Sequence, residues 1–317
     1  MSKPLVSIIL ALYNSERWLK EAVDSIIGQT LREFELIVID DGSTDKGVSI
    51  VQSYGDPRIR LIVQENAGLA AALNRGIEAA NAAYICRFDP DDICQENRLE
   101  VQYNFLVANP KVVAVGSAAM MIDEEGLNVC VYSKPQDHLS LLNMIPGSPF
   151  IHPSVMFKKE AYKRAGGYPE LMRLGGEDAV LFGRMAQVGE LCNIPDPLIY
   201  YRISASALSR KSKQFRSFLT ELIKAQIAGK EVTSDDLSVL HRLSTGSSQD
   251  KRFYYHADLS RMYAWGGGQS LSRKHALGAI ALKPWSLMSY LIIILSFLPS
   301  GFVQKLYYLV KKERFHK

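Results

Sequence analysis

Hydrophobic and polar positions in the first third of the chain form blocks that are typical of strands followed by helices. Four apolar runs have the length of buried strands, namely 6–12, 34–40, 59–63 and 84–88. Between the first two, apolar residues from Trp18 to Ile27 recur at helical spacing, and Gly28 closes the element. Strands and helices that alternate at this interval predict an α/β fold with a mostly parallel sheet flanked by helices.

The middle of the chain continues this pattern less regularly. Residues 112–121, 155–157 and 198–202 read as strands, and 159–164 and 178–188 read as helices. The stretch 122–150 is punctuated by Pro and Gly, so we expect loops with short strands there.

After about residue 210 the pattern becomes helical. Four segments show helical periodicity, namely 212–228, 234–243, 250–264 and 269–282. The sequence therefore predicts an α/β domain over 1–210 and a helical C-terminal region over 211–317.

The C-terminal region contains a long uncharged stretch. Residues 285–304 carry no charge. The stretch has the nominal length of a bilayer span, but Pro299 and Gly301 interrupt it. Lysines and aromatic residues flank it, as at membrane interfaces. We expect residues 285–317 to associate with the anionic cytoplasmic face of a membrane as an interfacial or re-entrant helix. A buried core helix is the alternative.

Composition narrows the class of protein. The chain has 317 residues, 47% of them hydrophobic and 22% charged, which is typical of a folded globular protein. A net charge of +4 gives no argument for nucleic acid. The four cysteines show no metal-binding spacing, and the N-terminus lacks the layout of a secretion signal. We therefore expect a cytoplasmic protein with reduced thiols.

The sharpest chemical signal is the segment Asp89-Pro90-Asp91-Asp92, which follows the apolar run 84–88. Carboxylates one residue apart at a strand end can converge on one hard cation such as Mg²⁺ or Mn²⁺. Such an ion would stabilise a leaving diphosphate. The alternative is a solvated turn that caps the helix beginning near Glu96.

Three other polar groups are weaker signals. Asp41 follows a strand and could accept hydrogen bonds from a nucleobase or a ribose, or simply cap a turn. Asp178, next to Glu177 at a helix start, is either a general base or a helix cap. Arg202 could contact a diphosphate, or be a surface residue after a strand.

Together and in this order, these elements resemble glycosyltransferase family 2, the inverting group with the GT-A fold. The resemblance covers roughly residues 4–210. It is carried by the segments 6–14, 35–45, 66–68, 72–76, 89–92, 152–154, 166–168, 177–178 and 201–202.

The resemblance implies a role for each matching residue. The donor-binding residues would be Leu12, Tyr13, Asn14, Asp41, Asn66, Arg75, Asp89 and Arg202, with Asp41 on the base. Asp91 would ligate Mn²⁺ or Mg²⁺, and Asp89 would contact the ribose or a metal-bound water. Asp178 would be the catalytic base, and Glu177 would shape the acceptor pocket beside it.

Two positions depart from the family pattern. Ala11 stands where the family usually has proline, and Ser204 stands where it often has histidine. If that histidine normally touches the metal or the diphosphate, this chain manages without it, which weakens the assignment of Arg202 to the donor.

The resemblance implies a metal-dependent glycosyltransferase that moves a sugar from a nucleotide-sugar, by family habit a UDP-sugar, to the hydroxyl of a glycan or lipid-linked acceptor. We expect a place in cell-surface polysaccharide or lipid-linked glycan synthesis. One alternative is a sugar-phosphate nucleotidyltransferase, although the basic glycine-rich loop that it needs is missing after the first strand. The other is a non-catalytic nucleotide-sugar-binding protein.

Overall fold

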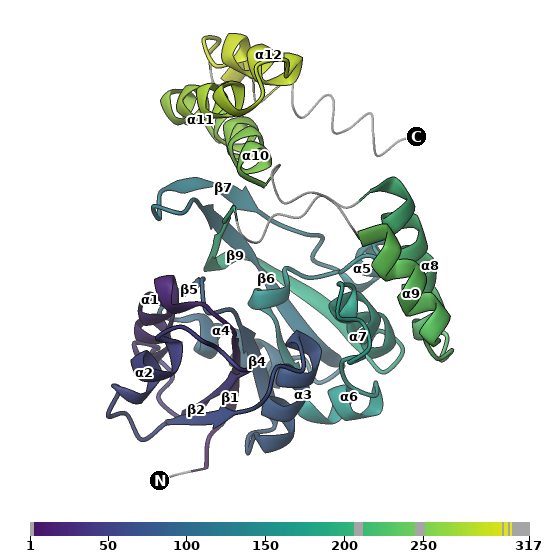
Figure 1. Ribbon diagram of the computed structural model, residues 1–317. Coiled ribbons are helices and arrows are strands. Elements are labelled where there is room, and N and C mark those ends of the chain that lie inside the picture. Colours follow the sequence, from purple (N-terminus) through teal and green to yellow (C-terminus); the bar gives the residue numbers. More distant parts are fainter. Residues whose placement is uncertain (1–2, 206–211, 245–250, 300, 304, 306–317) are drawn as a thin grey trace. The chain divides into compact units, whose positions relative to one another are not determined.

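The computed structural model describes residues 3–205, 212–244, 251–299, 301–303 and 305 (Figure 1). The chain divides into two compact units. The first comprises Met1–Ala119, Ser133–Tyr201 and Ser212–Thr245, and the second comprises Met120–Tyr132, Arg202–Lys211 and Gly246–Lys317. The helices over 212–245 thus group with the α/β part of the chain.

One half of a nine-stranded sheet is parallel. Its strands are β1 (Val6–Leu12), β2 (Phe34–Asp40), β3 (Ile59–Val63) and β4 (Tyr84–Phe88), in the order β3-β2-β1-β4. Each pairs in parallel with its neighbour. The predicted parallel arrangement of these four apolar runs is confirmed, and the strands have the predicted bounds.

The other strands make the sheet mixed. The order continues from β4 through β8 (Met156–Lys158), β6 (Val112–Ile122) and β9 (Glu190–Arg202) to β5 (Ile93–Cys94), and β7 (Asn128–Tyr132) pairs with β6. β8 is antiparallel to both β4 and β6, and β5 is antiparallel to β9.

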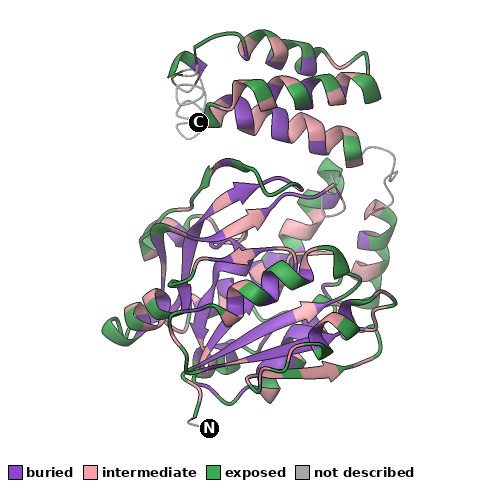
Figure 2. Ribbon diagram, turned by 90° about the vertical axis from the view of Figure 1, so that its left-hand side faces the viewer, coloured by how far each residue is buried: buried purple, intermediate pink, exposed green. Residues whose placement is uncertain are grey.

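Helices cover both faces of the sheet in the first unit. On one face lie α1 (Glu16–Ile27), α2 (Gly47–Gln52) and α4 (Arg98–Ala108). On the other lie α3 (Leu69–Ala79), α6 (Lys159–Arg164) and α7 (Glu177–Met185). β1 supplies both cores, because Ile8 and Leu10 face the first layer and Ile9 faces the second. The central strands are accordingly buried (Figure 2).

The first unit contains two further features outside the sheet layers. α5 (His138–Leu142) lies where the sequence led us to expect only loops and short strands. It begins because the Asp137 carboxylate accepts a hydrogen bond of 2.9 Å from the backbone amide of Ser140. α8 (Lys213–Ile227), followed by α9 (Ser234–Ser244), packs on α7 through Ile223 and Val180.

The second unit joins three helices to β7. These are α10 (Lys251–Gly266), α11 (Gln269–Leu282) and α12 (Leu287–Leu295). Within this unit the Tyr263 hydroxyl donates to the Asp123 carboxylate at 2.7 Å, which ties α10 to the turn after β6. No helix among the described residues combines the length and the hydrophobicity needed to cross a bilayer. The predicted tail residues beyond Lys305 lie outside the described part.

Candidate active site

The register of the parallel strands brings three predicted segments to one edge of the sheet. Leu12 at the end of β1 lies beside Asp40 at the end of β2, and Leu10 lies beside Phe88 at the end of β4. The residues that follow these strands therefore leave the sheet at the same carboxyl edge, where α/β folds bind ligands.

Three carboxylates meet directly after β4. One oxygen from each of Asp89, Asp91 and Asp92 lies within 4.8 Å of the others. Burial raises the pKa of Tyr201 near the end of β9, and the charges of Asp92, Asp89 and Asp91 raise it further. An all-oxygen, all-anionic set of ligands fits a hard divalent cation such as Mg²⁺ or Mn²⁺. Asp92 had no assigned role in the sequence analysis.

A buried arginine supports this acid cluster. Arg87 is only 4% exposed and forms an ion pair with Asp89. Its carbonyl accepts a hydrogen bond of 3.0 Å from Arg98 of α4, which also donates to the Pro153 carbonyl at 2.7 Å. Two buried cations therefore lie next to the end of β4, where they offset the desolvation cost of the carboxylates.

Glu177 and Asp178 form the first turn of α7. They follow Gly175 and Gly176, which have φ angles of 115° and 90°. Only glycine adopts this conformation without strain, and a Cβ on Gly176 would lie 2.9 Å from the Ile223 side chain. The two glycines therefore turn the chain sharply, so that both acids lie at the helix start.

The environment of Glu177 links α7 to the end of β4. Burial and then the charge of Asp178 raise the pKa of Glu177 to about 7, while Arg87 lowers it and Asp89 raises it. The charges of Asp178, Arg87 and Asp89 thus all act on Glu177. The structure therefore brings together Asp89, Glu177 and Asp178, and Asp91 lies with Asp89 in the acid cluster.

Several polar neighbours of the site were not identified as site residues from the sequence. The Tyr168 hydroxyl lies 2.8 Å from Nε2 of His152. Burial raises the pKa of Tyr168 well above its usual value, and the charges of Arg87 and Asp178 also act on it. Burial lowers the pKa of Lys134, which the charge of Asp178 opposes. Arg87 had a visible signal, since it is the one charged residue in the apolar run 84–88.

The Asp41 carboxylate holds the start of α3. One oxygen accepts hydrogen bonds from Gln64 Nε2 at 2.7 Å and from the Ala67 amide at 2.8 Å, and the other accepts from the Gly68 amide at 2.9 Å. Asp41 is 4% exposed. The side chain thus has the structural role that the sequence left open, and any bond from a nucleobase would add to these three.

Asn66 and Arg75 join the same network. The Asn66 side-chain amide donates to the Asp41 carbonyl at 3.0 Å, and Arg75 donates to the Gln64 side-chain oxygen at 3.1 Å. Because Gln64 itself bonds to Asp41, the three predicted donor-binding residues belong to one hydrogen-bonded group.

The side chains at the end of β1 and in the turn that follows differ in their exposure to solvent. Leu12 is fully buried in the core, and its carbonyl accepts from the Asp41 amide at 2.8 Å. Tyr13 is 52% exposed. Asn14 has a left-handed φ of 48°, and its side-chain oxygen accepts from the Thr44 amide at 2.8 Å. Tyr13 and Asn14 are thus the two exposed residues of this turn, whereas Leu12 belongs to the core.

Arg202 belongs to the second unit. It is 3% exposed, and one guanidinium nitrogen lies 3.3 Å from the Asp123 carbonyl and 3.5 Å from the Glu124 carbonyl. These bonds anchor the turn after β6. Contact between Arg202 and a donor diphosphate stays a prediction.

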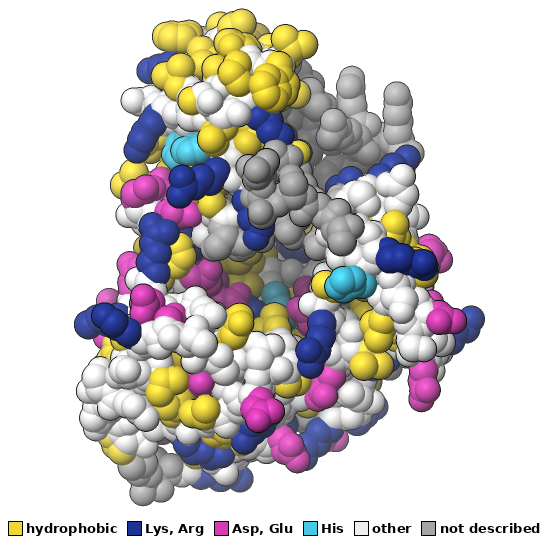
Figure 3. Space-filling view, in the orientation of Figure 1, with side chains coloured by type: hydrophobic (Ala, Val, Ile, Leu, Met, Phe, Trp, Pro, Cys, Tyr) yellow, Lys and Arg dark blue, Asp and Glu magenta, His cyan; other side chains and the backbone are white. Residues whose placement is uncertain are grey.

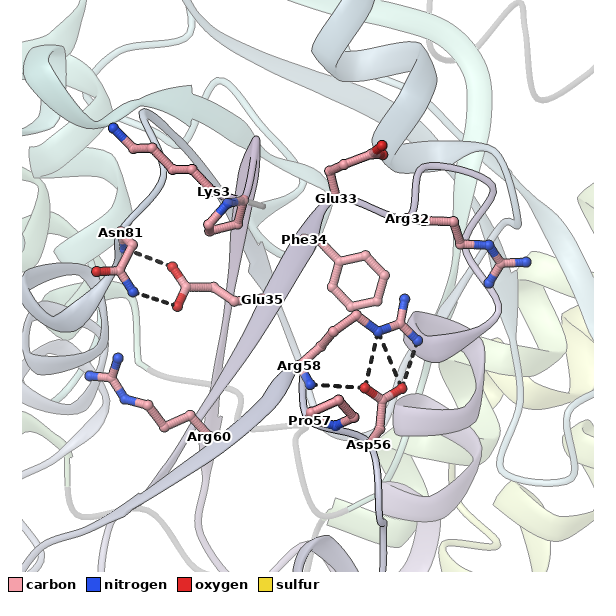
Figure 4. A pocket seen from close by; sticks show the side chains of 11 residues that line it. Lys3, Arg32, Glu33, Phe34, Glu35, Asp56, Pro57, Arg58, Arg60 and Asn81 are labelled. Carbon is pink, nitrogen blue, oxygen red and sulfur yellow. Dashed lines mark hydrogen bonds and ion pairs between the residues drawn. The ribbon is translucent and has the colours of Figure 1, made fainter. Parts of the chain in front are cut away.

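A separate pocket of about 1070 Å³ lies at the opposite edge, where β2 and β3 begin (Figure 4). Within it Arg58 bonds to Asp56 at 2.6 Å and the Asn81 side chain donates to Glu35 at 2.9 Å. Parallel sheets bind ligands at the carboxyl ends of their strands, so this pocket is distinct from the candidate site.

Comparison with known proteins identifies the family. A family model described as Glycosyl transferase family 2 matches residues 7–166, just over half of the chain. The chain belongs to glycosyl transferase family 2. This glycosyltransferase is 35% identical over 219 residues to EpsE of Bacillus subtilis (strain 168), a protein named provisionally as a glycosyltransferase. The alignment covers 67% of this chain and 77% of EpsE.

Solved structures resemble this family 2 glycosyltransferase in fold. S. aureus TarS 1–349 in complex with UDP-GlcNAc aligns with a TM-score of 0.58 at 18% identity, over 96% of this chain and 91% of TarS. The mannosyltransferase PcManGT from Pyrobaculum calidifontis in complex with GDP-Man and Mn²⁺ aligns with a TM-score of 0.53 at 18% identity, over 93% and 86%. These likenesses confirm the expected GT-A fold.

The raised pKa of Glu177 predicts a pH-dependent effect on stability. The native carboxyl keeps its proton up to about pH 7, whereas the unfolded carboxyl loses it near 4.5. Glu177 therefore lowers the free energy of unfolding as the pH rises through this window. We expect Glu177→Gln to stabilise the metal-free protein by about 1 to 3 kcal/mol more at about pH 8 than at about pH 5.

Urea unfolding at the two pH values measures this difference. Glu160→Gln, which replaces an exposed acid in the first turn of α6, is the matched control. An equal change in stability at both pH values for Glu177→Gln would contradict a raised pKa.

Proposed function

We propose that this glycosyltransferase moves a sugar from a UDP-sugar to an acceptor hydroxyl with inversion at the anomeric carbon, and that it uses Mn²⁺ or Mg²⁺. One observation carries the proposal. The carboxylates of Asp89, Asp91 and Asp92 lie together after β4, and Asp89 interacts with Glu177 at the start of α7. The UDP-GlcNAc in TarS and the GDP-Man and Mn²⁺ in PcManGT support a nucleotide-sugar and a metal.

In this proposal the acids after β4 hold the donor. Asp91 would ligate the cation, and Asp89, oriented by Arg87, would contact the ribose or a metal-bound water. When bound, the cation stabilises the negative charge that develops on the leaving diphosphate. Asp41 and its hydrogen-bonded group lie at the same edge of the sheet and would contact the base.

The acids at the start of α7 act on the acceptor. Asp178 accepts the proton of the acceptor hydroxyl, whose oxygen attacks the anomeric carbon opposite the leaving nucleoside diphosphate. Glu177 shapes the acceptor pocket, and with a pKa of about 7 it is protonated in a larger share of molecules near neutral pH than an ordinary glutamate, which reduces the charge next to Asp178. Two ionised acids side by side would repel each other more strongly.

The acceptor in this proposal is a glycan or a lipid-linked glycan used in the synthesis of cell-surface polysaccharide. The enzyme would work in the cytoplasm at the inner face of the cell membrane, with residues 285–317 as the attachment. The uncharged stretch 285–304 supports this location.

A donor screen tests the proposed reaction. We expect release of a nucleoside diphosphate from one UDP-sugar in the presence of Mn²⁺ or Mg²⁺, and at least about a hundredfold less after EDTA treatment. Release of pyrophosphate instead would indicate a nucleotidyltransferase. Binding of UDP-sugars without turnover, with acceptor glycans present, would indicate a non-catalytic protein.

A further inference from the structure

The outer side of α12 is apolar, unlike that of a helix on a water-soluble surface, and its inner side combines the core residue Ile292 with two serines. The two serines on its inner side, Ser289 and Ser296, are each 1% exposed. On its outer side Leu287 is 83% exposed and Ile294 is 63% exposed. An amphipathic helix in water buries the apolar side chains and exposes the polar ones. The outer side of α12 is thus suited to an apolar phase.

The exposed residues follow helical spacing and extend beyond α12. Positions 287, 291, 294 and 298 lie on one stripe, because they are three or four residues apart. We call the whole exposed set the apolar face. It consists of Leu277, Leu282, Trp285, Leu287, Met288, Tyr290, Leu291, Ile294, Phe297, Leu298 and Phe302. Figure 3 shows hydrophobic side chains gathered over α12.

The buried serines explain why this arrangement is stable. The Ser296 hydroxyl donates to the Ile293 carbonyl at 2.6 Å, and the Ser296 carbonyl accepts from Arg273 of α11 at 2.8 Å. The Ser286 and Ser289 hydroxyls lie 3.0 Å apart. Because these hydroxyls have partners within the α12 segment, the serine side can be buried without an unsatisfied polar group, and the leucine side is left outward.

The charge of this part of the chain identifies the partner. The sequence contains no Asp or Glu from 259 to 312 but seven Lys and Arg, of which Lys311 and Lys312 lie outside the described residues. Lys274 and Lys305 are exposed, and Trp285 and Tyr290 provide interfacial aromatic rings. Exposed apolar and aromatic side chains in a stretch of chain whose charged residues are all basic fit an anionic bilayer surface.

We propose that the apolar face docks on an anionic lipid bilayer, with α12 lying in the plane of the interface. α12 has nine residues, so its length is about 14 Å, against about 30 Å for the hydrocarbon core. It therefore lies on the membrane and does not span it. The docking surface rests on the membrane location given under the proposed function. It does not depend on which sugar is transferred or on which metal is used.

Vesicle co-sedimentation of the full chain tests the docking surface. We expect binding to vesicles of phosphatidylglycerol and phosphatidylcholine in equal parts, and much weaker binding to phosphatidylcholine alone. Leu287→Glu with Ile294→Glu should weaken binding to the anionic vesicles by at least about tenfold. Leu139→Glu with Leu171→Glu is the matched control, because these leucines are 72% and 57% exposed in the first unit. The control should bind like the wild type.

Three results would overturn the inference. They are no binding of the wild type to anionic vesicles, an equal loss in the control, and equal binding to neutral vesicles. If light scattering shows a dimer that Leu287→Glu with Ile294→Glu dissociates, and vesicles do not bind, the face pairs with a second copy of the chain. Nucleoside diphosphate release, measured in detergent-free solution on the same samples, separates a failure of docking from a failure of the proposed chemistry.

Discussion

Asp91→Asn should reduce sugar transfer by at least about a thousandfold, because a divalent cation contributes several kcal/mol to stabilising the leaving diphosphate. The substitution keeps the shape of the side chain but removes one of the three charges in the acid cluster. Initial rates with the UDP-sugar found in the donor screen measure the effect. Manganese binding, followed by the paramagnetic signal of the free ion, should weaken in parallel.

The control for this variant is Asp196→Asn, which replaces an exposed acid on β9 in the same unit. It should keep full activity and normal binding of manganese. If Asp91→Asn turned over within about threefold of the wild type, a difference of less than about 1 kcal/mol, the metal role of Asp91 would be wrong.

Asp178→Asn should lower kcat by about a hundredfold to ten-thousandfold, which is the usual contribution of a positioned general base. Asparagine can hold the same place in the first turn of α7 but cannot accept the proton of the acceptor hydroxyl. The KM for the donor should change little, because the donor is assigned to the acids after β4. Steady-state kinetics with donor and acceptor varied separately measure these values.

Comparison with Glu177→Gln decides which of the two neighbouring acids, Glu177 or Asp178, is the catalytic base. A neutral glutamine resembles the protonated form of Glu177, whose pKa is about 7. We therefore expect this variant to raise the KM for the acceptor more than it lowers kcat. The opposite pattern, in which Glu177→Gln loses turnover and Asp178→Asn keeps it, would transfer the role of base to Glu177.

The hydrophobic pattern of the sequence was sufficient to predict the strands of the parallel half of the sheet. β1, β2, β3 and β4 begin and end where the apolar runs do, because buried strands of a parallel sheet are apolar on both faces. The antiparallel half was less predictable from hydrophobic periodicity. β8 is only three residues long. β9 begins at Glu190, eight residues before the strand predicted over 198–202, and its first part lacks a clear period of hydrophobic residues. α5 depends on one side-chain cap and is too short to show helical periodicity.

The same contrast holds for the candidate site. Motif order alone predicted that Asp41, Asp89, Asp91, Glu177 and Asp178 are chemically important. It could not predict that Asp41 also caps α3 with both carboxylate oxygens, because the amides that it binds come 26 and 27 residues later. Nor could it predict the pKa of Glu177, which depends on burial and on the neighbouring charges.

By itself, the sequence determined the family, the parallel core and the chemical type of the site, since these depend on residue order and on local period. Only the tertiary structure decided which side chains surround the acids and which way α12 faces. Arg87, Tyr168 and His152 come together from separate elements. The outward side of α12 is set by contacts on its inner side, where Ile292 packs in the second unit and the Ser296 carbonyl accepts from Arg273. Burial and long-range contacts fix both outcomes, and neither is encoded in a local pattern.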